Sequence, residues 1–229
     1  MILYILLTGS LALSGVLISA LTLLALSAYG TAHQIRQAKN HSLSPSRFWR
    51  VAVLNSALSV AMVYGFAYLF GPRLFQAGSV SVLRCIVEGV AILMTFDFFY
   101  YLVHRYPFHE WKLLRRVHAV HHIVRNPSAV DSLYMHPLEN VIGLGLLWVC
   151  AFLVGLVAGP VSVYSFGWVF LVYSVLNVVV HAGIDMKGPG AALFTSLATR
   201  HNKHHVSMNG KNYASVTPIW DLVFRTEEP

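Results

Sequence analysis

Charged side chains are scarce in this sequence. Asp, Glu, Lys and Arg make up 11% of its 229 residues, whereas a soluble domain usually carries about 25%. Apolar residues make up 56%, and the mean hydropathy is +0.62. So little charge excludes an ordinary soluble domain, and so much apolar sequence excludes a disordered chain, which combines low hydrophobicity with high charge. The composition therefore indicates an integral membrane protein.

Other common signatures are also missing. Cys85 and Cys150 are the only cysteines, and each lies in an apolar stretch, so we expect two buried thiols and no disulfide framework. The sequence has no dinucleotide or phosphate-loop glycine motif and no low-complexity segment. The net charge of +7 could indicate nucleic-acid binding. However, the basic residues flank apolar stretches and do not gather in a folded basic domain.

Five apolar stretches are long enough to cross a bilayer, which requires roughly 20 residues per helix. They are residues 2–29, 51–70, 80–103, 141–158 and 161–180. The first is too long for a signal peptide and lacks a basic leader, so we expect it to be retained. The fourth is short enough to be a re-entrant hairpin, and Gly159-Pro160 predicts a tight turn before the fifth. We expect an all-α membrane protein with four to five transmembrane helices.

The basic residues distinguish the two faces of this membrane protein. Fourteen of the 16 Lys and Arg residues lie in three connections, at residues 33–50, 104–140 and 181–229. Because cytoplasmic connections carry an excess of Lys and Arg, we expect all three to be cytoplasmic. The second and third connections also contain ten of the 12 histidines, which predicts a histidine-rich helical cap on the cytoplasmic side.

Most of these histidines form three clusters. The clusters are His104 and His109; His118, His121 and His122; and His201, His204 and His205. In the second and third, positions i, i+3 and i+4 place three imidazoles on one helical face. In the first, Pro107 interrupts the helix, so that His104 can end one helix and His109 can begin the next. Eight neutral imidazoles packed together would be strongly destabilised if they took up protons, and a bound metal removes that problem. The clusters therefore predict a metal site.

Residues beside the clusters are candidates for supporting roles. Asp97 shares the helical face of His104, and a carboxylate there could orient a ligand histidine through its free ring nitrogen. His136 is either a partner of the ligands or an ordinary loop residue. Five aromatic or leucine side chains lie on the faces that lead to the clusters and are candidates for a substrate channel: Tyr101, Trp111, Leu114, Phe194 and Leu197. Trp111 and Phe194 are equally suited to be interfacial anchors.

Taken together, the motifs resemble the fatty acid hydroxylase/sterol desaturase superfamily, which contains membrane-bound non-haem di-iron oxygenases. The resemblance extends from about Asp97 to Thr226. Besides the three clusters, it is carried by Tyr134-Met-His-Pro-Leu-Glu139, His181-Ala-Gly183, Asn212-Tyr213 and Trp220-Asp221-Leu-Val-Phe224. The Tyr-x-His-Pro-x-Glu stretch and the tail favour the C4-methylsterol oxidase-like branch.

The resemblance implies nine histidine ligands for two iron ions and no catalytic residue beyond the ligands. The nine are His104, His109, His118, His121, His122, His181, His201, His204 and His205. In several relatives a second histidine follows four residues after the position of His181. Here that position is Asp185, so either its carboxylate is a ligand or one ligand is missing.

The resemblance also implies a function and a division of the chain. With O2 and electrons from a cytochrome b5-like or ferredoxin-like protein, the enzyme would hydroxylate or desaturate a sterol or fatty acyl lipid. Residues 1–95 would form the first two transmembrane helices and most of the third, and residues 96–229 a catalytic region with two further membrane helices. The membrane would be a bacterial inner membrane or the endoplasmic reticulum. The alternative is a non-catalytic metal transporter or sensor, although a transport path would place its ligands near the middle of the bilayer.

Overall fold

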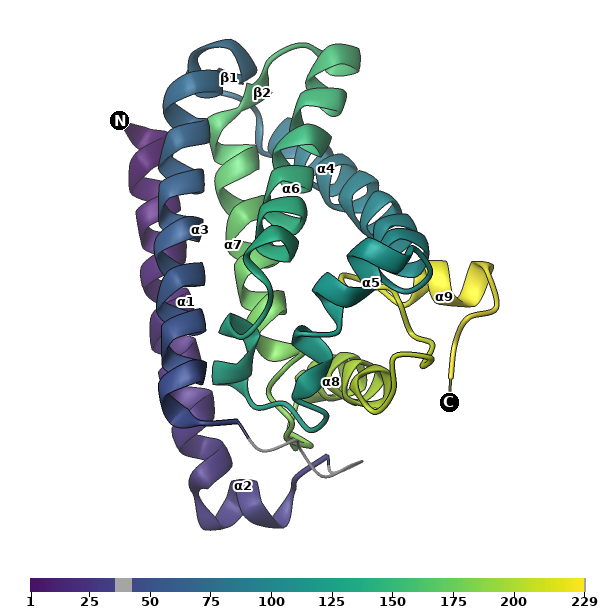
Figure 1. Cartoon of the computed structure of the whole chain (residues 1–229). Helices are drawn as coiled ribbons and strands as arrows, with labels where there is room; N and C mark the ends of the chain where they lie inside the picture. Colours follow the sequence, from purple (N-terminus) through teal and green to yellow (C-terminus); the bar gives the residue numbers. More distant parts are fainter. Residues whose placement is uncertain (36–42, 229) are drawn as a thin grey trace.

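The structure, a computed structural model, describes residues 1–35 and 43–228, and this part is almost entirely helical (Figure 1). The long helices are α1 (Ile2–Leu26), α3 (Pro45–Leu74), α4 (Val82–Val103), α6 (Pro137–Ala158) and α7 (Val163–Val179). The shorter helices are α2 (Ala28–Ala32), α5 (Lys112–His118), α8 (Ala191–His205) and α9 (Ile219–Val223). A π-helical turn forms η1 (His104–Phe108), and short 3-10 helices form η2 (His121–Ile123) and η3 (Ala129–Leu133). The two-residue strands β1 (Phe75–Gln76) and β2 (Val161–Ser162) pair in parallel.

Local sequence signals fix where the long helices begin and end. The side chains of Ser44, Ser81, His136 and Ser162 each accept a backbone N–H in the first turn of α3, α4, α6 and α7, respectively. In α3 and α6 a proline follows the capping residue, and there its missing N–H has no cost. Gly159, with φ of 84°, ends α6, so the turn predicted from Gly159-Pro160 is present.

The long helices pack as a bundle around an apolar core. α1 lies along α7, α3 lies along α6, and α4 crosses both α6 and α7. The close contact of α1 with α7 requires Gly167, since a Cβ atom there would lie 2.5 Å from the side chain of Leu6. Near the β1–β2 end, buried Glu88 accepts bonds from Arg84, Ser165 and the backbone N–H of Ser162. This network joins α4 to the start of α7.

Three helices in the described part of the chain are long and apolar enough to cross a membrane, namely α1, α3 and α6. The structure therefore confirms a mainly helical chain with membrane-spanning helices, but not the expected number of four to five. The 22 residues of α4 include Arg84, Glu88 and Asp97, and this helix is inclined to the others, while α7 has only 17 residues (Figure 1).

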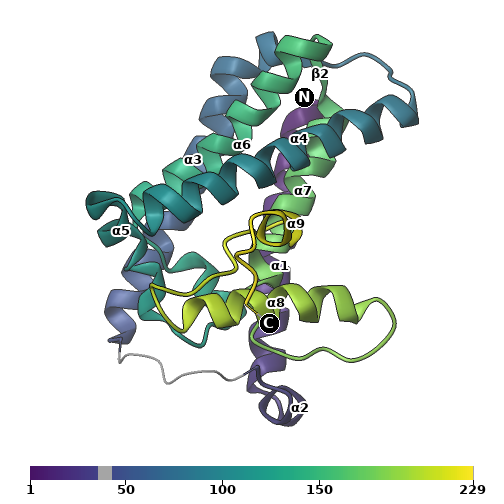
Figure 2. The same ribbon diagram turned by 90° about the vertical axis from the view of Figure 1, so that its right-hand side faces the viewer.

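The two histidine-rich connections lie on the same side of the bundle (Figure 1). The segments containing α5 and α8 lie beside its lower half, far from β1 and β2 at the other end (Figures 1 and 2). Arg36 and Lys39, which contribute to the predicted charge asymmetry, lie outside the described residues. The histidine-bearing segments thus gather on one side of the bundle, below α4.

Candidate metal centre

All nine histidines that were expected to be ligands converge in two groups. The five-histidine group contains His104, His109, His118, His122 and His204. The four-histidine group contains His121, His181, His201 and His205. Within each group, one ring nitrogen from every histidine lies within 4.8 Å of the others. The groups adjoin, because the ring of His122 stacks on that of His205 with centroids 4.8 Å apart.

Each three-histidine motif divides its side chains between the two groups. His118 and His122 lie in the five-histidine group, whereas His121 lies in the other. The second motif does the reverse, since His201 and His205 lie in the four-histidine group and His204 in the other. The expectation that the three imidazoles of each trio act together on one helical face is therefore wrong. Each motif gives two side chains to one group and one to its neighbour.

Hydrogen bonds orient seven of the nine rings. The Nδ1 atoms of His104, His109, His118, His121, His181, His204 and His205 lie 2.7–3.1 Å from a carbonyl or carboxylate oxygen. An oxygen of that kind only accepts, so each Nδ1 carries a proton and donates it. In the neutral ring this leaves Nε2 as a bare lone pair. The rings are therefore fixed with lone pairs directed into the groups.

The Nε2 atoms of neighbouring rings lie close together in both groups. Six Nε2···Nε2 distances are 2.9–3.1 Å, including His104 to His118 and His181 to His201. Nε2 of His109 is buried and has no hydrogen-bond partner among the described residues. Two nitrogens bound at about 2.0–2.1 Å to one metal would lie roughly 2.9–3.3 Å apart. The donor chemistry and spacing of both groups therefore fit metal ions.

Burial makes protonation of these rings unfavourable. Desolvation lowers the pKa of His118 and that of His181 to about 3, and lowers the pKa of His109 to about 4. The same desolvation, reinforced by neighbouring imidazoles, holds the pKa values of His104, His122, His201, His204 and His205 well below the usual 6.5. At neutral pH the imidazoles of the two groups are thus neutral, which is the form of histidine that can bind a metal ion.

A short stretch near the C-terminus holds much of the five-histidine group. Backbone carbonyls of Met208, Lys211 and Tyr213 accept the Nδ1 protons of His109, His204 and His104, respectively. The remaining oriented ring, that of His118, donates to the Glu139 carboxylate at 2.9 Å. We call residues 208–213 the carbonyl segment.

Side chains from distant parts of the chain anchor the carbonyl segment. Asp221 accepts the backbone N–H groups of Tyr213 and Ala214, both at 2.9 Å. Asn212, at φ of 62°, bonds with the backbone of Arg200 and Glu228. Burial raises the pKa of Asp221, but its four hydrogen-bonding and charge partners act in the opposite direction. The Asn-Tyr and Trp-Asp signals in the sequence therefore correspond to a support for His104.

The four-histidine group is held by other segments. Its Nδ1 acceptors are the carbonyls of Asn177 in α7, Tyr134 after η3 and Val124 after η2. None of these three acceptors belongs to the carbonyl segment. The two groups thus share ligand motifs but have separate supports.

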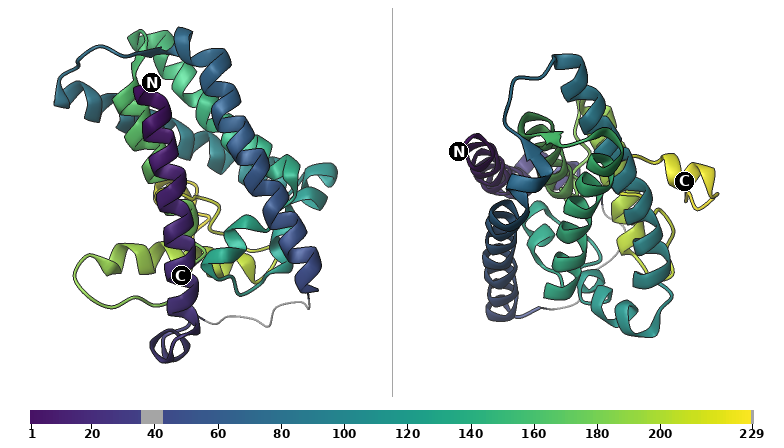
Figure 3. Two further views of the ribbon diagram at one scale, coloured as in Figure 1. Left: turned by 90° about the vertical axis from the view of Figure 1, so that its left-hand side faces the viewer. Right: turned by 90° about the horizontal axis from the view of Figure 1, so that it is seen from above.

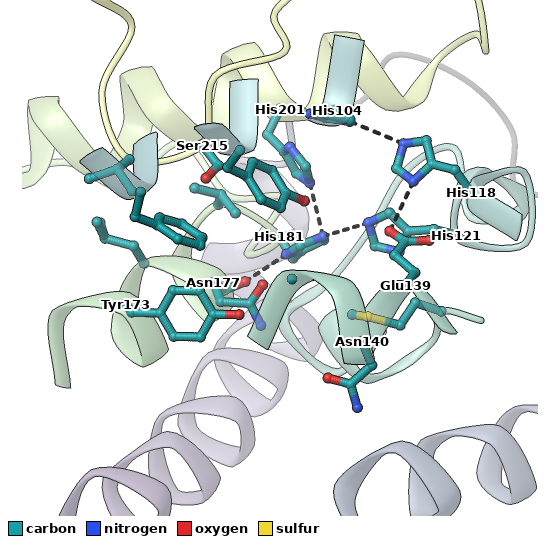
Figure 4. A pocket seen from close by; sticks show the side chains of 17 residues that line it. His104, His118, His121, Glu139, Asn140, Tyr173, Asn177, His181, His201 and Ser215 are labelled. Atoms are coloured by element: carbon teal, nitrogen blue, oxygen red, sulfur yellow. Dashed lines mark hydrogen bonds and ion pairs between the residues drawn. The ribbon is translucent and has the colours of Figure 1, made fainter. Parts of the chain in front are cut away.

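A cavity of about 80 Å3 touches both groups (Figure 4). Its histidines are His104 and His118 from one group and His121, His181 and His201 from the other. The remaining wall comes mainly from α4, α6 and α7 and includes Phe96, Tyr100, Tyr173 and Leu176. We call this space the histidine cavity. It places an apolar wall directly beside the directed nitrogens.

The three supporting residues, for two of which the sequence left alternatives open, all lie outside the two histidine groups. Asp185 lies in neither group, and its carboxylate pairs with Lys187 on an exposed surface. His136 caps α6 through its Nδ1 atom, 3.1 Å from the N–H of Leu138. Asp97 accepts the N–H of Val216 and the N–H and hydroxyl of Thr217, so it fixes the backbone beyond the carbonyl segment and does not orient an imidazole.

The five candidates for a channel wall do not line the histidine cavity. Trp111 is 59% exposed, and Leu114 lies on the same short helix, α5. Phe194 and Leu197 lie on α8, where Phe194 packs against a separate apolar cluster that contains Val178. The Tyr101 hydroxyl bonds with Thr226, and its ring stacks on Phe224.

The sequence contained a signal for a residue that orients a histidine and for a residue of the cavity wall. Glu139 bonds to His118 as Asp97 was expected to do, and it ends the Tyr-x-His-Pro-x-Glu stretch. Tyr100 lines the histidine cavity, and it lies four residues before His104 on the same helical face. The carbonyl acceptors gave no signal, because every residue type has a backbone carbonyl.

Comparison with known proteins agrees with this arrangement. The family model described as fatty acid hydroxylase matches residues 89–226. The chain is 30% identical over 151 residues to methylsterol monooxygenase 1 of Rattus norvegicus, covering 64% of this chain and 47% of the relative. It is 30% identical over 147 residues to very-long-chain aldehyde decarbonylase GL1-9 of Oryza sativa subsp. indica, covering 62% and 55%. It is 24% identical over 153 residues to sphinganine C4-monooxygenase 2 of Arabidopsis thaliana, covering 65% and 57%.

Two groups of converging histidines beside helices long and apolar enough to cross a membrane define an integral membrane protein with a histidine-rich site that fits metal ions. The chain belongs to the fatty acid hydroxylase family, as the match over more than half its length shows. It spans about half the length of the curated relatives it matches. No solved structure matches it.

Proposed function

We propose that this chain is a membrane-bound di-iron oxidoreductase that uses O2 and external electrons to hydroxylate or desaturate a sterol or fatty acyl lipid. The observation that carries the proposal is the pair of adjoining imidazole groups, which both contribute histidines to one cavity with an apolar wall. The names of two relatives, a methylsterol monooxygenase and a sphinganine monooxygenase, support oxidation of a lipid.

The nine histidines are the proposed ligands, with the five-histidine and four-histidine groups each holding one ion. Imidazole suits zinc, copper, iron and nickel, so the donor atoms alone do not select iron. Family membership supports iron. When bound, the irons would supply the O2 chemistry that amino acid side chains lack.

The protein's own residues prepare the site for that chemistry. Glu139 and the carbonyl segment fix the five-histidine group, and the carbonyls of Val124, Tyr134 and Asn177 fix the other. The burial that keeps the imidazoles neutral also keeps bulk water from the reacting atoms. Phe96, Tyr100 and Leu176 offer only a ring, a phenol and an alkyl chain to the substrate. Such a wall favours a hydrocarbon segment of the lipid beside the metals.

Topology and partners complete the proposal. α4 and α7 act as further membrane segments, giving four to five, and residues 96–229 form the catalytic part. The histidine-rich end faces the cytoplasm, where Lys112, Arg116 and Lys211 are exposed near the site. A basic surface of this kind suits an acidic cytochrome b5-like or ferredoxin-like electron donor.

The alternative of a non-catalytic metal transporter or sensor predicts a different composition and behaviour. Purified full-length protein should contain two irons per chain, and cells expressing it should accumulate a lipid that gains 16 mass units or loses 2. One zinc per chain with no change in cellular lipids would contradict the oxygenase and support metal handling. The His204→Ala variant, which should remain inserted in the membrane, is the inactive control for the lipid profile.

A further inference from the structure

A second, larger space lies between the two membrane-spanning helices that precede the family match. It has a volume of about 710 Å3 and is lined from α1, α3, η3, α6 and α7. We call it the α1–α3 chamber. The two helices separate toward the histidine-bearing end of the bundle (Figure 3, left). The volume falls within the range of about 300–1,000 Å3 that is usual for small-molecule sites.

The chamber is suited to hydrocarbon. None of its lining residues is charged, and Leu11, Ile18, Val63, Leu144 and Phe170 form much of its wall. Its hydroxyl groups are mostly occupied by the protein itself. Those of Ser14, Ser19 and Ser56 each donate to a carbonyl four residues earlier in their own helix. The chamber therefore offers few polar groups to solvent or to a polar ligand.

The chamber also borders the histidine cavity. Asn140, Tyr173 and Asn177 line both spaces, and the carbonyl of Asn177 accepts the Nδ1 proton of His181. In Figure 4, Tyr173 and Asn177 lie on the same side of His181. The chamber therefore adjoins the space beside the proposed metals, with these three residues as the shared wall. Two of its lining side chains, Leu23 and Trp49, are 69% and 56% exposed, so the chamber reaches the surface of the protein there.

We infer that the α1–α3 chamber binds the hydrocarbon part of the lipid substrate, so that α1 and α3 determine which lipid reaches the metals. This inference rests on the proposed function. It assigns substrate selection to residues 2–26 and 45–74, which lie outside the matched residues 89–226. Family members with similar metal sites can then differ in substrate through these two helices.

Two matched pairs of substitutions test the chamber. Gly15 lines it, whereas Gly9 lies on the same helix outside its lining, and a Cβ at either position meets nothing within 4 Å. Gly15→Leu should fill the chamber, and Gly9→Leu should not, while both remove one helical glycine and change helix propensity equally. On α3, Val60→Trp is the filling variant, and Val53→Trp, at an exposed position outside the lining, is its control.

The readout is photolabelling of full-length protein in detergent with two probes, a diazirine-bearing 16-carbon fatty acid and a diazirine-bearing cholesterol. At least one probe should label residues 11–23, 130–133 or 170–178, and excess unlabelled lipid should compete. Gly15→Leu and Val60→Trp should reduce this labelling at least tenfold, and the two controls should leave it within twofold. Labelling that does not saturate, or that the filling variants do not change, would overturn the inference.

Metal content and product formation separate this inference from the proposed function. If the filling variants keep two irons but lose or alter the oxidised lipid, the chamber selects the substrate. Saturable labelling in a chain that contains zinc and makes no product would contradict the proposed function and retain a lipid-binding chamber. Unchanged product in Gly15→Leu would overturn the assignment of the chamber to the substrate.

Discussion

The two histidine groups share their ligand motifs but differ in how they are supported. In the five-histidine group, one glutamate and three carbonyls of residues 208–213 orient the rings. In the four-histidine group, the acceptors are carbonyls of α7 and of the connections after η2 and η3. The groups are linked because each three-histidine motif contributes one side chain to the other group, His121 in one direction and His204 in the other. The comparison teaches that similar histidine motifs can be oriented mainly by the carbonyl segment in one group and by α7 and the connections after η2 and η3 in the other.

The largest effect should come from removing the exchanged histidines. His121→Ala should remove the ion of the four-histidine group, and His204→Ala that of the five-histidine group, since each loses a ligand donated by the opposite motif. Both variants should reduce lipid oxidation to background and lower the iron content from two toward one per chain. Iron analysis and Mössbauer spectra of the membrane-inserted variants check this. Two irons in both variants would contradict the division of ligands.

Loss of the Glu139 carboxylate should affect only the five-histidine group. Partners that hold a ligand histidine typically contribute about 10–100-fold in metal affinity or activity. Glu139→Ala should fall in this range because His118 loses its acceptor, and Glu139→Gln should fall less because an amide oxygen can still accept. Iron titration with a competing chelator measures the effect on each site. A loss from the four-histidine group would show that the supports are not separate.

Asp221 should have a smaller effect on the same group. Asp221→Asn weakens two bonds to the backbone at Tyr213 and Ala214, so the carbonyl that holds His104 becomes less fixed. We expect about a tenfold or smaller loss of iron affinity at the five-histidine group. The Mössbauer signal of the other group should be unchanged. An equal loss at both groups, or normal retention at both, would remove Asp221 from this role.

Acidification should destabilise the metal-free chain. The folded pKa values of His118 and His181 are about 3 and that of His109 about 4, whereas the usual value is 6.5. Between these limits the unfolded chain binds more protons, so stability is complete above about pH 6.5 and decreases as the pH falls toward 3. Each imidazole contributes up to about 1.4 kcal/mol per pH unit in this window. Thermal unfolding in detergent from pH 8 to 4 measures the trend, and a flat profile would contradict it.

The smallest effect should come from Asp185. Its carboxylate is exposed, pairs with Lys187 and lies in neither group. Asp185→Asn should change the free energy of unfolding by less than about 0.5 kcal/mol, with iron content and lipid oxidation unchanged. Loss of an iron in this variant would show that Asp185 is a ligand after all.

The convergence of the nine histidines was predictable from the sequence because the spacing within each motif is a local property. The spacing of His201 and His205 places both on one helical face, and Gly159-Pro160 marks the turn between α6 and α7. The division of the trios could also have been found. On a helix of about 100° per residue, positions i and i+4 differ by about 40°, but i+3 and i+4 differ by about 100°. His204 therefore faces away from His205, toward the other group.

The supports could not be read from the sequence in the same way. His104 and its acceptor Tyr213 are 109 residues apart, and the acceptor is a backbone atom. Asp97 was assigned to an imidazole because it lies near His104 in the sequence, but the backbone at residues 216–217 reaches its carboxylate first. In such cases the chain path decides which polar groups meet. Residue type and spacing contain little of that information.

The position of the carbonyl segment has a consequence for biogenesis. His104 and His109 leave the ribosome about a hundred residues before the carbonyls that orient them, so their rings remain free to rotate until synthesis has passed residue 213. The five-histidine group is consequently completed late in synthesis. A nascent or clipped polypeptide that lacks the carbonyl segment has unoriented rings at this group. An ion held by all five histidines would therefore require a chain that extends beyond residue 213.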